Sequence, residues 1–278
     1  MTKTLLIIAT LDTKGAEAAY VKDCAEQLGV RTLLMDVGTL SSPLVKPDIL
    51  SDTIAAAAGY NLAHSKEKKD RSNAVKAMQE GGSIIARQLS HEGKIDGVLG
   101  MGGGTGTAMV TFIMRALPFG MPKIVVSTVA SRDIREYIGT KDILMFHSVA
   151  DILGSNDFLR HILAQAAYAV CGMMRLGTVI KTNKPMVAVT AYGINSVCAM
   201  HAEPLLTARG YEMIGFHANG CGGMAMEELV EQGLIAGVLD FTPHEIADEM
   251  FGGYCRGIGP MRFETAGKKG IPLLLAPG

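Results

Sequence analysis

The stretch DGVLGMGGGTGT, residues 96–107, places a short apolar strand at 97–99 directly before a turn rich in glycine, and a helix begins near Thr107. In this strand–turn–helix arrangement, backbone N–H groups can approach an anion closely and the helix N-terminus faces it. The turn lacks the lysine of a Walker motif. It favours phosphate or nucleotide binding over a merely tight turn between strand and helix.

The regions on either side of this turn alternate between short apolar runs and longer amphipathic stretches. Such alternation is typical of parallel strands connected by helices, and near-continuous apolar runs indicate strands buried on both faces. The sequence therefore predicts an α/β fold. The expected strands are 4–9, 31–35, 97–99, 123–127, 186–190, 212–216, 237–240 and 273–276, and the expected helices 14–28, 73–92 and 156–176 each end at a glycine.

The second half of the chain repeats the strand order of the first half. The polar segment 178–185 marks the expected boundary between an N-terminal nucleotide-binding subdomain, residues 1–180, and a second subdomain, residues 185–278. The second half has no counterpart to residues 132–177. We therefore expect the second subdomain to be incomplete, C-terminally truncated, with exposed apolar surface beside the strand at 273–276.

The composition excludes several classes of partner. The chain has 278 residues with 26 Lys and Arg against 27 Asp and Glu, so its net charge of -1 gives no electrostatic reason to bind nucleic acid or an anionic membrane. Five cysteines without a C-x-x-C pair indicate reduced thiols, and no signal peptide is apparent. The longest uncharged stretch, 97–114, contains six glycines, which argues against a membrane-spanning helix. We expect a soluble, cytoplasmic protein with a small-molecule partner.

A second polar turn follows the first strand. In an open parallel sheet, ligands lie beyond the carboxyl ends of the strands. There Lys14 can neutralise a phosphate, Thr10 and Thr13 can donate to its oxygens, and Asp12 can hold a magnesium ion through water. The alternative is that Asp12 or Thr13 only caps the following helix. Thr128, Val129, Ala130 and Ser131 form a further turn after the strand at 123–127.

The second half has its own glycine-rich turn, within residues 216–227. His217 stands at a strand end beside it, and could act as a general acid or base with Glu227 or Asp240 as its carboxylate partner. A histidine at a strand end can equally be a structural residue. Thr242 and Glu245 look like a capping box at a helix start.

Four strings follow one another along the chain: ATLDTKG from Ala9, DGVLGMGGGTGT from Asp96, PKIVVSTVAS from Pro122 and FHANGCGGMAME from Phe216. Together they resemble the Tm-one-like ATP-binding domain family, which includes bacterial proteins and the N-terminal inhibitory domain of the tomato mosaic virus resistance protein. The resemblance covers essentially the whole chain. It implies two Rossmann-like subdomains, ATP with Mg²⁺ held mainly by the first, and a homodimer. The implied nucleotide positions are Thr10, Asp12, Thr13, Lys14, Gly102, Gly103, Gly104, Thr105, Gly106, Thr107, Thr128, Val129, Ala130 and Ser131.

Three functions remain open from the sequence. The first is a nucleotide-binding protein with ATP and magnesium, whose role is regulatory or weakly catalytic. The second is an enzyme acting on a small phosphorylated or carboxylated metabolite in a cleft between the two halves, with His217 as acid or base. The third is a protein-interaction module, whose partner would leave no readable mark in the sequence.

Overall fold

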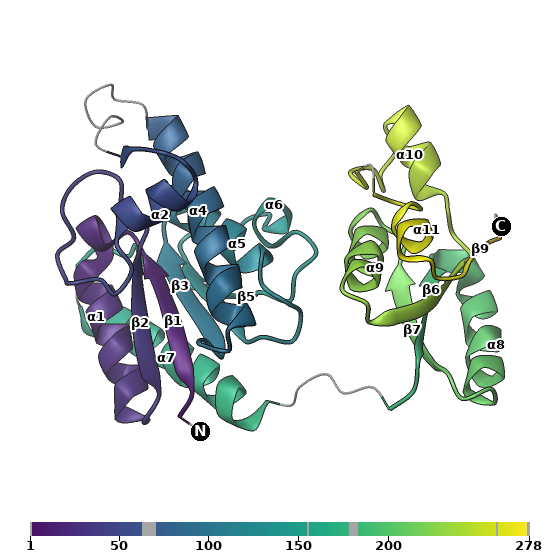
Figure 1. The fold of residues 1–278 in the computed structure, drawn as a ribbon, viewed down its shortest axis with the longest axis horizontal. Coiled ribbons are helices and arrows are strands. Elements are labelled where there is room, and N and C mark those ends of the chain that lie inside the picture. The colour runs from purple at the N-terminus through teal and green to yellow at the C-terminus, as the bar shows by residue number, and fades with distance from the viewer. Residues whose placement is uncertain (1, 63–70, 155, 178–182, 260, 277–278) are drawn as a thin grey trace. The chain divides into compact units, whose positions relative to one another are not determined.

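The computed structural model describes residues 2–62, 71–154, 156–177, 183–259 and 261–276. The chain divides into two units, Met1–Val179 and Ile180–Gly278, which are shown in Figure 1 and described separately below. Most of the predicted boundary segment, 178–182, lies outside the described residues. Among the described helices, none combines the length and the apolar character that crossing a membrane requires.

The first unit is built on a five-stranded parallel sheet in the order β2-β1-β3-β4-β5. Its strands are runs of Leu, Ile, Val and Met, whose side chains alternate between the two faces. Leu5 and Ile7 pack on one face, whereas Leu6 and Ile8 pack on the other. The strands are β1 (Thr4–Ala9), β2 (Arg31–Asp36), β3 (Gly97–Gly102), β4 (Lys123–Ser127) and β5 (Leu144–His147).

Helices cover both faces of this sheet (Figure 1). The first helix and the last helix pack together against one face, and α2, α4 and α5 pack against the other. These five helices bury apolar residues, so the sheet lies between two hydrophobic clusters, whereas the short α6 buries none of its residues. The helices are α1 (Leu11–Gln27), α2 (Ser51–Ala57), α4 (Arg71–His91), α5 (Gly104–Arg115), α6 (Arg135–Ile138) and α7 (Asp157–Leu176).

The second unit has a four-stranded parallel sheet in the order β7-β6-β8-β9. Its smaller core includes Phe216, Met226 and Val238. The strands are β6 (Met186–Ala191), β7 (Glu212–His217), β8 (Ile235–Asp240) and β9 (Leu273–Leu275); the helices are η1 (Gly193–Asn195), α8 (Ser196–Thr207), α9 (Cys221–Glu231), α10 (Glu245–Phe251) and α11 (Thr265–Lys269).

The α/β class, the eight predicted strands and the internal repeat are confirmed. β6, β7, β8 and β9 occupy the same places in their sheet as β1, β2, β3 and β4 in theirs. Leu274 and Leu275 on the last strand are about half exposed, which agrees with the apolar surface expected there, and the extent of this surface stays a prediction. The sequence missed β5, whose four residues are all partly or fully exposed and therefore show no buried apolar run.

Candidate functional site

The first unit has a topological switch point between β1 and β3. The chain runs from β1 to β2 on one side of the sheet and returns to β3 on the other side, so a crevice is expected at the carboxyl ends of β1 and β3. Ile8 pairs with Gly100 in the register of these strands. β1 ends at Ala9 and β3 at Gly102, so Thr10 and the glycine turn follow the carboxyl ends of neighbouring strands, which lie roughly 4.8 Å apart in a sheet. The structure therefore brings the first two predicted turns together.

The glycine turn exposes the N-terminus of α5. The helix begins at Gly104, earlier than predicted, and its N-cap residue Gly103 has no side chain that could cap the free N–H groups. Among the described residues, no side chain bonds to these groups. A β-carbon on Gly102 would lie 2.7 Å from Gly106, so this glycine is required by the packing of the turn itself. A β-carbon on Gly104 would meet nothing within 4 Å. The turn thus offers uncapped amides beside open space, which is the arrangement that binds anions.

The turn after β4 is attached to the glycine turn. Thr128 donates its backbone N–H to the carbonyl of Gly102 at 3.3 Å, and its hydroxyl would lie 3.8 Å from a β-carbon on Gly103. Thr107 is fully buried, and its hydroxyl is 2.7 Å from that of Ser127. Thr107 therefore connects the two turns instead of facing solvent. Val129 and Ala130 are half-buried, Ser131 and Thr105 are exposed, and Gly106 is partly exposed.

The turn after β1 is helical from Leu11 onward, so Asp12 and Thr13 lie inside α1 and do not cap it. The hydroxyls of Thr10 and Thr13 are 2.9 Å apart near the surface. Lys14 has non-helical backbone angles at a kink, and its ammonium donates to the carbonyl of Ile152. An ammonium has three donors, so this contact leaves capacity for a ligand.

Two buried carboxylates lie behind this turn. Oδ2 of Asp12 accepts from the amides of Leu40 and Ser41 at 2.9 and 3.3 Å, whereas Oδ1 is buried without a partner among the described residues. Asp36 accepts the amide of Leu11, and burial, together with the nearby charge of Asp12, raises the pKa of Asp36. Sequence reasoning missed Asp36, because an aspartate at a strand end is unremarkable in sequence.

In the second unit, the guanidinium of Arg262 forms ion pairs with three carboxylates. Its guanidinium lies 2.6 Å from Asp240, 2.8 Å from Glu245 and 3.4 Å from Glu227, and all four side chains are at most 3% exposed. Burial acts to lower the pKa of Arg262, but Asp240 and Glu245 outweigh it and raise this pKa. The two carboxylates predicted as partners of His217 are therefore paired with Arg262.

The capping box expected at Thr242 and Glu245 is not formed. The helix α10 begins at Glu245 itself, after His244. Oε1 of Glu245 accepts the amide of Gly220 at 2.6 Å, and Oε2 pairs with Arg262. Glu245 thus turns inward to hold the glycine-rich turn before α9, because a buried guanidinium and a buried amide both need an acceptor.

His217 lies against aromatic neighbours. Its ring stacks on Tyr192 with centroids 5.0 Å apart, and the ring of His244 lies 4.8 Å from the same tyrosine. Tyr192 follows β6, His217 ends β7, and His244 follows β8. Three neighbouring strand ends therefore contribute rings to the edge of this sheet where ligands bind in parallel folds.

Comparison with known proteins covers nearly all of the chain. The N-terminal domain model of the uncharacterised protein family UPF0261 matches residues 3–178, and the C-terminal domain model matches residues 184–278. The chain belongs to the UPF0261 family. A UPF0261 protein of Clostridium tetani is 42% identical over 100% of this chain and 69% of its own length, and one of Rhizobium meliloti is 41% identical over 90% and 62%.

A plant protein is also similar. The ToMV susceptible protein tm-1(GCR26) of Solanum lycopersicum is 39% identical over 75% of this chain and 28% of its own length.

Among solved structures, an S. aureus MnaA–UDP co-structure aligns over 100% of this chain and 69% of that chain. Its TM-score of 0.33 and sequence identity of 12% are too low to carry an argument.

The two UPF0261 domains carry different chemistry at their strand ends. The N-terminal domain offers backbone amides, hydroxyls and Lys14 around the glycine turn. The C-terminal domain offers carboxylates, imidazoles and thiols, several of them buried. The first set suits an anion and the second suits a cation.

Proposed function

We propose that the N-terminal domain binds ATP with Mg²⁺ at the carboxyl ends of β1, β3 and β4, in a regulatory or weakly catalytic role. The observation that carries the proposal is the uncapped N-terminus of α5 at the switch point, with open space around Gly104. The free N–H groups of a helix N-terminus favour a phosphate through both hydrogen bonds and the helix dipole.

The neighbouring side chains have defined roles in this proposal. The amides of Gly104, Thr105 and Gly106 contact the phosphates, and the hydroxyl of Thr128 borders the same turn. Thr10 and Thr13 supply further hydroxyls, and Lys14 adds a positive charge beside its contact with Ile152. Gly102, Gly103 and Thr107 shape the turn, and residues 129–131 border it.

Asp12 is the residue that would hold magnesium. Its Oδ2 is held by two amides, whereas its Oδ1 is buried and has no hydrogen-bond partner in the described part of the chain, so Oδ1 has capacity to accept a cation. Magnesium commonly takes one or two carboxylates together with phosphate and water. When bound, the ion supplies charge neutralisation at the phosphates.

We also propose a homodimer in the cytoplasm. The half-exposed Leu274 and Leu275 on β9 give the second unit apolar surface that a second copy could cover. All five cysteines are free, as a reducing compartment would maintain them. Light scattering of the purified chain tests the dimer directly, and a monomer at all concentrations would refute it.

The nucleotide proposal is tested by calorimetric titration of Mg-ATP into the full chain and into Gly104→Val. The valine side chain enters open space, so the free protein should fold, but it would occupy the position proposed for phosphate. Gly172→Val is the matched control, because Gly172 lies within α7 and a β-carbon there also meets nothing within 4 Å.

The wild type and Gly172→Val should bind ATP equally, and Gly104→Val should lose at least about tenfold in affinity, the equivalent of one lost charge-assisted contact. Thermal shifts provide a second readout, since a ligand at 100 times its dissociation constant stabilises by roughly 2.7 kcal/mol. Unchanged binding by a folded Gly104→Val variant, or no ATP binding by the wild type, would overturn the proposal.

A further inference from the structure

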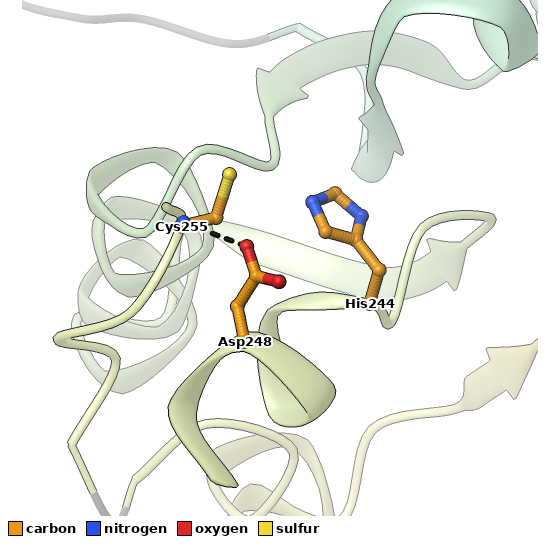
Figure 2. Close-up of side chains that lie close together, drawn as sticks. All are labelled: His244, Asp248 and Cys255. Carbon is orange, nitrogen blue, oxygen red and sulfur yellow. Dashed lines mark hydrogen bonds between the residues drawn. The ribbon is translucent and has the colours of Figure 1, made fainter. Parts of the chain in front are cut away.

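A group of three different donors lies at the start of α10 in the second unit. His244 immediately precedes the helix, Asp248 lies one turn later, and Cys255 follows the helix end. Their nitrogen, oxygen and sulfur atoms all lie within 4.8 Å of one another (Figure 2). Oδ2 of Asp248 also accepts the backbone N–H of Cys255 at 2.7 Å, which ties the loop to the helix. The three side chains therefore converge because the local fold holds them together.

One nitrogen of the His244 imidazole, Nε2, is buried and has no hydrogen-bond partner among the residues that the structure describes. In Figure 2 one ring nitrogen faces the thiol of Cys255 and the carboxylate of Asp248. Buried polar atoms in folded proteins nearly always have a partner, so an orphaned one aimed into a donor cluster indicates a missing ligand. The ring is held from the side by Tyr192, at a centroid distance of 4.8 Å.

The surroundings of the cluster are negative. Tyr192 and Asp248 both hydrogen-bond to the thiol of Cys255, and the negative charges of Asp248 and Glu245 disfavour a thiolate at this position. Glu245 belongs to the group in which one guanidinium faces three buried carboxylates. A cation at the cluster would offset this excess of negative charge.

We propose that His244, Asp248 and Cys255 bind one divalent cation of the zinc class. Imidazole nitrogen, carboxylate oxygen and thiolate sulfur are the three ligand types of zinc, whereas magnesium and calcium prefer oxygen alone. Tetrahedral zinc places its ligand atoms roughly 3.3–3.8 Å apart, whereas the three atoms here lie within 4.8 Å of one another. Side-chain rotations that move these atoms by about 1 Å would therefore complete the geometry. Binding converts the thiol to a thiolate and releases its proton to solvent.

Three protein ligands leave the fourth position of a tetrahedral ion open. This is the ligand count of catalytic rather than structural zinc sites. The site lies just beyond the carboxyl end of β8, beside Tyr192 at the end of β6. The open position would accept a water or an oxygen atom of a small substrate, which the ion would polarise.

The test uses the full chain, reduced and stripped of metal by a chelator, titrated with Zn²⁺ against a chromophoric chelator and separately with Co²⁺. The variants are His244→Gln, Asp248→Asn and Cys255→Ser. The matched controls are His201→Gln and Cys198→Ser, because both residues are exposed on α8 in the same unit. Circular dichroism establishes that each variant is folded.

The wild type and both controls should bind one Zn²⁺ per chain and give a sulfur-to-cobalt charge-transfer band. Each of the three variants should weaken Zn²⁺ binding at least about 100-fold, since even partners outside the ligand shell are worth roughly 10–100-fold. Cys255→Ser should also lose the cobalt band. If Cys255→Ser fails to fold, His244→Gln decides the question, because this ring is only half-buried. A folded wild type without Zn²⁺ binding, or a folded His244→Gln variant with wild-type affinity, would overturn the proposal.

Discussion

Arg262→Met removes the only cation among four buried side chains of the Arg262 group. The guanidinium lies 2.6, 2.8 and 3.4 Å from the carboxylates of Asp240, Glu245 and Glu227, each at most 3% exposed. The charge of the group is +1 from arginine and -3 from the carboxylates, which gives -2 in the wild type and -3 in the variant. Methionine fills a similar volume, so the change tests charge and hydrogen bonding more than packing.

The expected loss of unfolding free energy in the second unit is about 3–5 kcal/mol, the cost of breaking a buried ion pair by removing one partner. This corresponds to a change of roughly 10²–10⁴ in the ratio of folded to unfolded molecules. A domain of about 100 residues with 5–15 kcal/mol of stability would become marginal.

Hydrogen exchange measured by mass spectrometry suits this test, because peptides from each unit report their own opening free energy. Exchange should accelerate in β6, β8 and α9 of Arg262→Met, while the sheet of the first unit keeps its wild-type protection. Arg209→Met, at an exposed position after α8, is the matched control. A loss below about 1 kcal/mol would show that the carboxylates do not depend on the guanidinium, and the reasoning would be refuted.

Three further changes test the first unit. Asp142→Asn should lower the unfolding free energy of the first unit by about 1–3 kcal/mol, measured by urea titration, because it removes the ion-pair partner at 2.8 Å from the fully buried ammonium of Lys123. Solvent screens the partly exposed Asp142, which favours the low end of this range. Burial raises the pKa of Asp36 above the usual 3.8, so protonation stabilises the folded state at acid pH and this contribution is lost as the pH rises. The non-titrating Asp36→Asn should therefore gain stability relative to the wild type as the pH rises from about 4 to 7, and a constant difference would contradict this. Lys14→Ala should weaken ATP by roughly tenfold while sparing adenosine, whereas equal losses would show that breaking the contact with Ile152 deformed the site.

Much of the fold was predictable because burial leaves a periodic trace in the sequence. Strands between two layers of helices must be apolar on both faces, and the runs at β1 and β4 were located to the residue. β5 escaped because it lies at the sheet edge and is partly exposed, so its residues need not be buried. The start of α5 was placed late because its first turn contains two glycines, which in sequence resemble a loop.

A candidate site could be predicted from the sequence only where backbone amides form it. A turn that presents amides must be poor in side chains, so the glycines of residues 100–106 are visible in sequence. The Arg262 group has no such trace, because its members lie up to 35 positions apart and charged residues are usually exposed. The sequence placed Glu245 correctly in the first turn of a helix but assigned it to a capping box, because only the fold shows that its carboxylate turns toward Arg262.

The two units share a strand order but differ in the charge that their switch points favour. In the first unit the turn after β3 presents amides to open space. In the second unit, β8 ends at Asp240, whose Oδ1 accepts from the hydroxyl of Thr190 at 2.6 Å and from the backbone N–H of Thr242 at 3.2 Å. The other carboxylate oxygen pairs with Arg262, so a carboxylate already occupies the amide of Thr242 in the turn after β8. The ligand atoms of His244, Asp248 and Cys255, which follow β8 in the chain and are shown in Figure 2, suit a cation. We therefore expect Gly104→Val to lose ATP and keep zinc, and His244→Gln to lose zinc and keep ATP. Loss of both ligands in either variant, measured by paired titrations, would contradict an assignment of one ligand to each sheet.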